Sequence, residues 1–209
     1  MSDPEGSERN RAAFPGFPSQ AEAGVNATDE DVRLMLAFST GDDAAFDALF
    51  GRWAAPLLRY LERMLRDAAG AEELVQEVFL RVHGARERYQ PQARFSTWLY
   101  RIATNLALNE LRRPHRRALH TRLDEPDGPA LAADGPAAED AFDARRLSAR
   151  VDHELASLPE RQRAALCLTA VEGLSYAEVA AALEISKSAV KALVHRARTA
   201  LAERIGNEE

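Results

Sequence analysis

Apolar residues recur at steps of three and four along two long stretches of the chain, which is the spacing of amphipathic helices. The clearest run has the apolar side chains Phe46, Leu49, Phe50, Trp53, Leu57, Leu58, Leu61 and Leu65. Further helices are expected near residues 29–38, 70–83 and 96–113, and again from about residue 144 to residue 205. No stretch alternates apolar and polar residues over the length of a strand, so the pattern predicts an all-α fold.

Capping residues set the expected ends of the helices. Three pairs fit a capping box, in which a Ser or Thr side chain and an acid three residues later each satisfy a free backbone amide: Thr28 with Asp31, Ser157 with Glu160, and Ser175 with Glu178. Ser96 is expected to cap the helix that carries Trp98. Gly84 and Gly173 are expected to end helices, because glycine tolerates the left-handed conformation common there.

Composition divides the chain into a tail, two small helical domains and a linker. Residues 1–27 contain several Pro and Gly and little apolar periodicity, which predicts a disordered tail. Residues 28–113 form the first helical domain and residues 144–206 the second. Between them, residues 114–143 change from a run of arginines to a run of acids among Pro and Gly, which is typical of a flexible linker. The acidic part either competes with DNA for basic surfaces or serves only as a solvated spacer.

The strongest local signal lies in residues 174–198, LSYAEVAAALEISKSAVKALVHRAR. Their apolar positions bury one short helix against a second across a short turn, with the small Ala180 at the crossing, which is the helix-turn-helix pattern of proteins that read the DNA major groove. The outward side chains of the second helix are Lys187, Ser188, Lys191 and His195, followed by Arg196 and Arg198. Lys187 and Ser188 suit base edges, whereas the arginines suit phosphates. Glu184 stands in the turn where Gly is usual. A helical hairpin with a merely solvated basic face is the alternative for this segment alone.

An acidic and amide patch is expected on the first domain. Glu73, Gln76 and Glu77 lie at helical spacing, opposite much of the apolar stripe. Such a patch repels DNA and suits a basic protein partner, unless it is only a solvated helix face.

A second surface of the first domain combines a basic helix flank with an aromatic loop. Arg101, Asn105 and Arg112 share one flank at about 100° per residue, and Arg113 follows them. Asn reads base edges and Arg holds phosphates. In the preceding loop Tyr89 stands among arginines, where an aromatic ring suits stacking on unpaired bases, with core packing as the alternative.

The net charge restricts how the chain meets DNA. At −6 it lacks the basic excess with which proteins hold phosphates unaided. Another protein that binds this chain is therefore expected to supply much of the affinity for DNA.

No catalytic, metal or cofactor site is predicted. The single cysteine, Cys167, excludes a disulfide scaffold and a cysteine zinc cluster, the histidines lack metal-ligand spacing, and no phosphate-cradling Gly loop appears. Gly41, Asp42 and Asp43 are expected to cap a helix rather than bind a metal. No apolar run approaches the ~18 residues of a membrane span, and the acidic start lacks the layout of a signal peptide. We therefore expect a cytoplasmic protein that is not an enzyme and has no membrane span.

Three segments, taken in order, resemble those of the bacterial sigma-70 family, in its small extracytoplasmic-function (ECF) group: AEELVQEVFLRV, FSTWLYRIATNLALNELRR and LPERQRAALCLTAVEGLSYAEVAAALEISKSAVKALVHRAR. The resemblance covers about residues 29–205. Ala189, Ala192 and Leu193 depart from it, because Thr, Ser and Arg are frequent there, so individual base contacts of the last helix do not carry over.

The resemblance implies a transcription initiation factor that binds core RNA polymerase, directs it to specific promoters and assists melting of the −10 element. Glu73, Gln76 and Glu77 match the family's motif for docking on the clamp coiled coil of the polymerase. The segment from Tyr89 to Arg113, with Asn105, matches the part that recognises the −10 element, and the second domain resembles the reader of the −35 element. Family membership adds an anti-sigma factor as a candidate partner. A stand-alone helix-turn-helix regulator with an N-terminal helical sensor is the alternative, but it leaves the acidic patch beside a basic aromatic loop unexplained.

Overall fold

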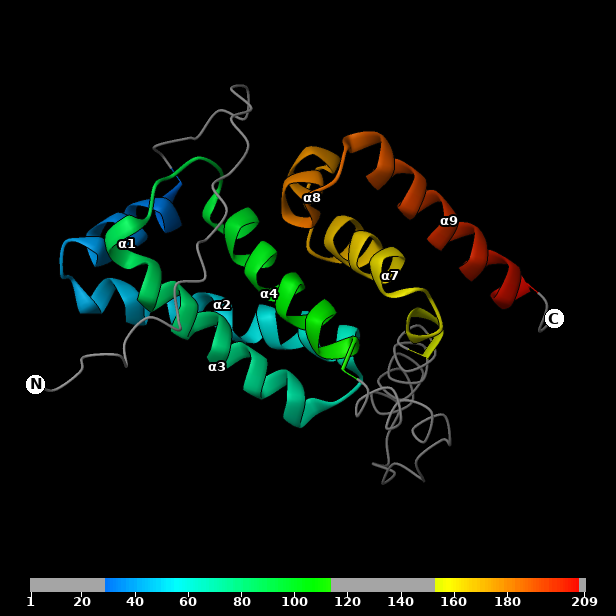
Figure 1. Ribbon diagram of the computed structural model, residues 1–209, viewed down its shortest axis with the longest axis horizontal. Coiled ribbons are helices and arrows are strands. Elements are labelled where there is room, and N and C mark those ends of the chain that lie inside the picture. Colours follow the sequence, from blue (N-terminus) through cyan, green and yellow to red (C-terminus); the bar gives the residue numbers. More distant parts are fainter. Residues whose placement is uncertain (1–28, 114–152, 207–209) are drawn as a thin grey trace, which may run out of the picture.

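The structure is a computed structural model that describes residues 29–113 and 153–206, and within these ranges it contains helices and no strand (Figure 1). The first domain comprises α1 (Glu30–Ser39), α2 (Asp43–Leu65), α3 (Ala68–Ala85), a 3-10 turn (Arg86–Arg88) and α4 (Phe95–Leu111). The second comprises α7 (Glu160–Leu166), a π-helical turn (Cys167–Val171), α8 (Tyr176–Leu183) and α9 (Lys187–Gly206). The all-α prediction is confirmed. The predicted tail, the predicted linker and the first residues of the second domain lie outside the described residues.

Helix α4 is the element on which both domains pack. One side of it contacts α2 and α3, and the other contacts α7 and α8, so it lies at the centre of the view in Figure 1. Most of its side chains are buried, among them Leu99, Tyr100 and Ala103. Burial from two sides explains why α4 is apolar around most of its circumference instead of along one stripe.

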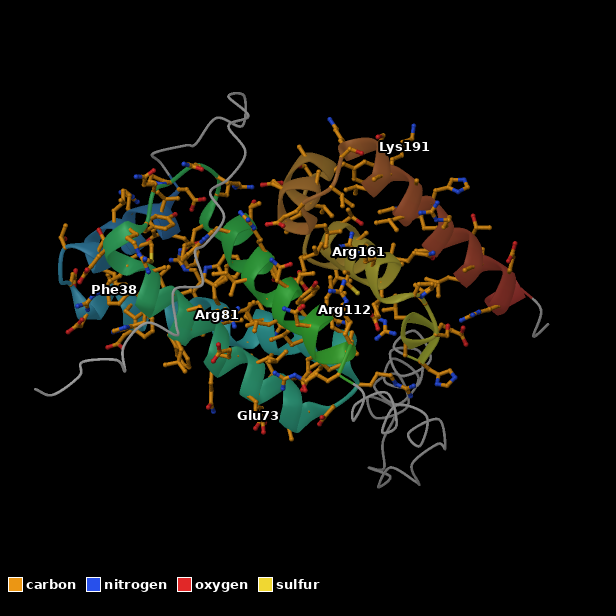
Figure 2. The ribbon with its side chains drawn as sticks, in the orientation of Figure 1. Phe38, Glu73, Arg81, Arg112, Arg161 and Lys191 are labelled. Carbon is orange, nitrogen blue, oxygen red and sulfur yellow. The ribbon has the colours of Figure 1, made fainter. Side chains whose placement is uncertain are left out.

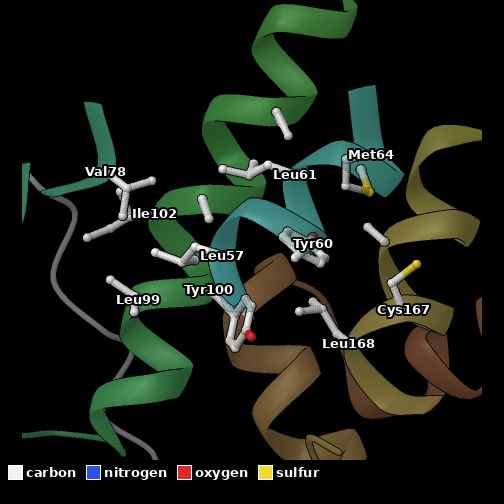
Figure 3. Packing of buried hydrophobic residues seen from close by; sticks show 14 of the residues in the cluster. Leu57, Tyr60, Leu61, Met64, Val78, Leu99, Tyr100, Ile102, Cys167 and Leu168 are labelled. Atoms are coloured by element: carbon white, nitrogen blue, oxygen red, sulfur yellow. The ribbon is translucent and has the colours of Figure 1, made fainter. Parts of the chain in front are cut away.

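A single hydrophobic core continues from the first domain into the second. The rings of Tyr60 and Tyr100 meet edge to face with centroids 5.3 Å apart, and the fully buried Leu168 lies beside them (Figure 3). The Thr104 hydroxyl donates to the Tyr100 carbonyl oxygen at 2.7 Å. Because that bond uses its one proton, its oxygen accepts from the Tyr60 hydroxyl, also at 2.7 Å. The polar atoms in this part of the core therefore satisfy one another.

Several predicted caps are confirmed. Asp42 is the N-cap of α2, and its side chain accepts from the Ala45 amide at 3.3 Å. Ser175 and Glu178 form both bonds of a capping box at the start of α8. Gly173 follows Glu172, the C-cap of the π-helical turn, and its φ of +70° is the left-handed conformation that glycine adopts most easily after a helix end.

The predicted start of the first helix is wrong by one position and that of the fourth helix by two. The N-cap of α1 is Asp29, whose side chain accepts from the Asp31 amide at 3.2 Å, instead of a box between Thr28 and Asp31. The N-cap of α4 is Arg94, which makes no side-chain capping bond, and Ser96 lies inside the first turn. The buried aromatic residue between them begins this helix, which shows that core packing outweighs the serine cap.

Two other predicted helix ends are also wrong. Ser157 donates its hydroxyl to the Glu154 carbonyl at 2.6 Å, and Pro159 is the N-cap of α7, so no box forms with Glu160. A short helical turn ends just before Ser157, and its unpaired carbonyls compete for the hydroxyl. Gly84 lies inside α3, because the backbone continues from this helix into the 3-10 turn without a left-handed residue.

Candidate functional site

Helices α8 and α9 form the predicted helix-turn-helix. Val190 and Val194 of α9 are buried against α8, and Ala180 is partly buried where the helices approach each other. Glu184 occupies the turn with φ 54° and ψ 45°, and its backbone amide bonds the Ala180 carbonyl. The left-handed turn expected from the motif is therefore present with a glutamate in place of glycine.

The outward face of α9 is basic, as predicted. The side chains proposed for DNA contact all lie exposed on it, namely Lys187, Ser188, Lys191, His195, Arg196 and Arg198. At the start of the helix the Ser186 hydroxyl accepts from the Ala189 amide at 3.2 Å and lies 2.9 Å from the Ser188 hydroxyl. Further along, a shallow groove of about 380 Å³ is lined by Tyr176 together with Lys191, His195 and Arg198. The remaining lining residues are Val194, Thr199 and Ala202, and the two cationic side chains of the groove, Lys191 and Arg198, are of the kind that contacts phosphates.

The acidic patch lies on the outer face of α3. Glu73 and Gln76 are exposed, while Glu77 is half-buried and forms an ion pair with Arg81 at 2.9 Å. Sequence reasoning missed Leu80, which is 67% exposed. It stands seven residues after Glu73 and therefore lies on the same face. The spacing alone could have revealed that an apolar side chain extends the patch.

The basic flank of α4 is split by the second domain. Asn105, Arg112 and Arg113 are exposed, and Arg113 pairs with Glu110 at 3.0 Å. Arg101 is only 8% exposed and forms an ion pair with Glu184. The structure thus brings the later part of the predicted flank together at the surface and buries its first member between the domains.

Tyr89 packs inward in this structure. Its ring centroid lies 5.1 Å from that of Trp98, and its hydroxyl is buried with no hydrogen-bond partner among the described residues. Burial raises the pKa of Tyr89, with a further contribution from Asp29 and Asp31. Stacking of this ring on a base would therefore require the loop to turn it outward.

The described residues contain no group of three His, Cys, Asp or Glu side chains placed to hold a metal ion. Over the same part of the chain, no helix combines the length and apolar character needed to cross a bilayer. Cys167 is buried in the core.

Comparison with known proteins identifies both domains. Residues 49–117 match the family profile of Sigma-70 region 2, and residues 148–201 match Sigma-70, region 4. The chain is 36% identical over 180 residues to the ECF RNA polymerase sigma factor SigE of Mycolicibacterium smegmatis, covering 85% of this chain and 69% of that protein. It is 32% identical over 178 residues to the RNA polymerase sigma-H factor of Pseudomonas aeruginosa, covering 83% of this chain and 92% of that protein.

The fold is also similar to that of two solved structures. CnrH, solved in complex with the cytosolic domain of CnrY, gives a TM-score of 0.66 at 25% identity and covers 87% of this chain and all of its own. RpoE of Bartonella quintana, solved with the anti-sigma factor NepR, gives 0.57 at 20% identity over 78% of this chain and 98% of its own, which compares the fold alone. The chain belongs to the sigma-70 family, in its ECF group.

Proposed function

We propose that this sigma factor, which directs RNA polymerase to promoters, divides its work among three surfaces. The outer face of α3 docks on the polymerase, the exposed flank of α4 with the loop before it recognises the −10 element, and the basic face of α9 reads the −35 element. The observation that carries the proposal is the placement of opposite charges: Glu73 on α3 and Lys191 on α9 point outward at opposite sides of the molecule (Figure 2). One face suits a basic protein partner while the other is free for DNA.

The docking surface combines charge with an apolar contact. Glu73 and Gln76 present acceptors, and the exposed Leu80 adds a side chain that gains from leaving water. Arg81 already neutralises part of the charge of Glu77 through its ion pair. We therefore assign Glu73, Gln76 and Leu80 the larger share of the binding energy.

The DNA-binding surfaces need the polymerase to become selective. The cationic row of α9 belongs to a chain with a net charge of −6, so long-range attraction to DNA is weak. Holding both domains on the polymerase raises their effective concentration at a promoter. Because it is acidic, the chain without polymerase also binds non-specific DNA weakly.

The −10 element is assigned to Asn105, Arg112 and Arg113, which are accessible as the chain stands. Unstacking a base costs a few kcal/mol, which contacts in a pocket must offset. Tyr89 and Arg101 join this surface after a rearrangement, because the first is packed inward and the second is covered by the other domain.

The proposal has two further parts. A protein inhibitor regulates this chain, and the chain acts in the cytoplasm. RpoE of Bartonella quintana was solved with the anti-sigma factor NepR, and the shared fold supports a partner of this kind here. The polymerase that the chain serves works in the bacterial cytoplasm. The stand-alone regulator is not favoured, because regions 2 and 4 are both matched.

Binding to core polymerase tests the docking assignment. Gln76→Ala combined with Leu80→Ala should weaken the affinity of the full chain for core enzyme by at least about tenfold, since the minority of interface side chains that carry most of the binding energy each cost more than about 1 kcal/mol when truncated, and these two are assigned to that minority. Glu203→Ala removes an exposed acid from the far end of α9 and serves as the control. If both variants bind core enzyme as wild type does, α3 is not the docking surface.

A further inference from the structure

Lysine occurs at only two positions in this chain. Of its 27 lysines and arginines, Lys187 and Lys191 are the only lysines, and the others are arginines. The two stand four residues apart in α9, and residues at this spacing are neighbours on a helix surface. Lysine, unlike arginine, is the usual target of acetylation, which removes its charge. The only side-chain amines of the chain therefore lie on the helix that is proposed to read the −35 element.

Both amines are accessible, but they differ in their surroundings. Lys187 and Lys191 are exposed, and neither has an ion-pair partner among the described residues. Lys191 points outward from α9 (Figure 2) and lines the groove between this helix and the start of α8, whereas Lys187 does not line it. One chain thus holds an amine inside the groove and a second amine outside it, which serves as an internal reference.

The groove combines cations and hydroxyl groups without an acid. The polar side chains that line its volume of about 380 Å³ are those of Lys191, His195, Arg198, Thr199 and Tyr176, and no carboxylate of the described residues lines it. A guanidinium binds phosphate oxygens through charge-assisted hydrogen bonds, and a hydroxyl donates another. The groove therefore suits a small phosphorylated molecule that lies next to an amine.

We propose that the groove binds a small acyl phosphate, such as acetyl phosphate, and that Lys191 takes the acyl group from it. Arg198 holds the phosphate. His195 follows Lys191 by one turn of the helix, so its imidazole is placed to accept a proton from the ammonium group.

The transfer needs no further reactant. His195 accepts one proton of the Lys191 ammonium group and passes it to water. The free Nζ attacks the carbonyl carbon, a C–N bond forms, and the C–O bond to the phosphate breaks. Inorganic phosphate leaves with that electron pair and takes up the second proton, while the third proton stays on the amide nitrogen.

Acylation removes the charge that Lys191 brings to DNA, so it weakens reading of the −35 element; this consequence rests on the proposed function of α9. The loss of one phosphate contact lowers the slope of log affinity against log salt concentration by about 0.9. DNA bound along α9 in turn covers the amine and excludes the acyl phosphate. The chain is therefore open to modification when it is free and protected at a promoter.

Mass spectrometry of peptides from the full chain, after incubation with acetyl phosphate, tests the site. Acetylation of Lys191 should be about tenfold faster than that of Lys187, because only the first amine lies beside a bound donor. Inorganic phosphate should slow acetylation of Lys191 and leave that of Lys187 unchanged. Equal rates at the two lysines, or equal effects of phosphate on them, would overturn the proposal.

Two variants separate binding of the donor from transfer of the proton. Arg198→Gln should raise the concentration of inorganic phosphate that protects Lys191 by about tenfold, since a hydrogen bond to a charged group is lost. His195→Gln should slow acetylation of Lys191 by at least about tenfold and leave the protecting concentration unchanged. Arg161→Gln, at an exposed position of α7, is the control. If both groove variants behave as the control does, these side chains take no part in acylation.

Transcription with core polymerase tests the consequence. Lys191→Gln carries an uncharged amide, as acetyl-lysine does, and should lower transcripts from a promoter with an intact −35 element several-fold. Lys191→Arg keeps the charge and should retain most of them. Equal transcription by the two variants would overturn control of −35 reading by acylation. A failure of the proposed function would appear separately, as absence of polymerase-dependent transcripts with unmodified wild-type protein, and would leave the mass-spectrometric result unaffected.

Discussion

Arg163 of α7 reaches into the first domain and donates a hydrogen bond to the Met64 carbonyl oxygen at 2.6 Å, near the end of α2. The same guanidinium donates to the carbonyls of Ala156 and Leu158. Burial lowers the pKa of Arg163. One side chain thus ties the end of a helix in region 2 to the start of region 4.

Replacing Arg163 with Met should strongly destabilise the protein. The change leaves three buried or partly buried carbonyls without their charged donor, and we expect the free energy of unfolding to fall by about 3 kcal/mol. Urea denaturation monitored by circular dichroism measures it. Arg161→Met, at an exposed position of the same helix, is the control and should change little (Figure 2). Equal stability of the two variants would mean that Arg163 does not couple the domains.

Alkaline pH should destabilise the fold through buried tyrosines. Burial raises the pKa of Tyr60, Tyr89 and Tyr100, and for Tyr100 the contact with Glu172 adds to the effect. The unfolded chain ionises these groups near pH 10, before the native state does, so stability is fully present below that pH and falls above it.

Each such tyrosine contributes a slope of up to about 1.4 kcal/mol per pH unit. The free energy of unfolding, measured with urea between about pH 9 and pH 11, should therefore fall less steeply with pH for the Tyr60→Phe, Tyr100→Phe variant than for wild type. Comparing slopes removes the constant loss caused by the missing hydrogen bonds. Identical slopes would show that other groups govern the alkaline transition.

Mutation should separate the contribution of the Tyr89 ring from that of its hydroxyl. Tyr89→Phe keeps the ring against Trp98 and removes a buried hydroxyl without a partner in the described residues, so unfolding free energy should stay equal or rise by about 1 kcal/mol. Promoter opening, followed by permanganate reactivity of unpaired thymines, should persist in Tyr89→Phe and decline in Tyr89→Ala. If Tyr89→Ala opens promoters normally, this ring takes no part in melting.

Lys187→Ala with Lys191→Ala should reduce use of the upstream promoter element. The two side chains are exposed on α9, and loss of the proposed base or phosphate contacts should lower transcription about tenfold on an intact promoter. On a template whose −35 element is replaced, transcription with the same variant should be only slightly lower than with wild type. Arg33→Ala on α1 is the control. An equal loss on both templates would argue against groove contact by α9.

Local sequence was sufficient for the helices and for the exposed rows of side chains. The period of three and four located α2 and α9, and the outward residues of α9 are all exposed as expected. Caps were predicted where the side chain acts on its own helix, as at Asp42 and Ser175. They failed where a neighbouring turn or the core competes, as at Ser157 and Ser96.

The burial of Arg101 could not be predicted from its helix. Periodicity places it on the same flank as Asn105, and nothing within α4 distinguishes the two. What buries Arg101 is the packing of α7 and α8 on α4, and its partner Glu184 lies far along the chain beyond the predicted linker. The departure of Glu184 from the usual glycine was visible in sequence, but its partner was not.

Transcription from fragments of the source genome, with core RNA polymerase and mapped RNA 5′ ends, tests the central claim most directly. Adding the chain should create a set of start sites that share two elements at a constant spacing, while the chain without polymerase should bind the same fragments weakly at physiological salt. Start sites that are the same with and without the chain, or tight specific binding by the chain alone, would contradict the account.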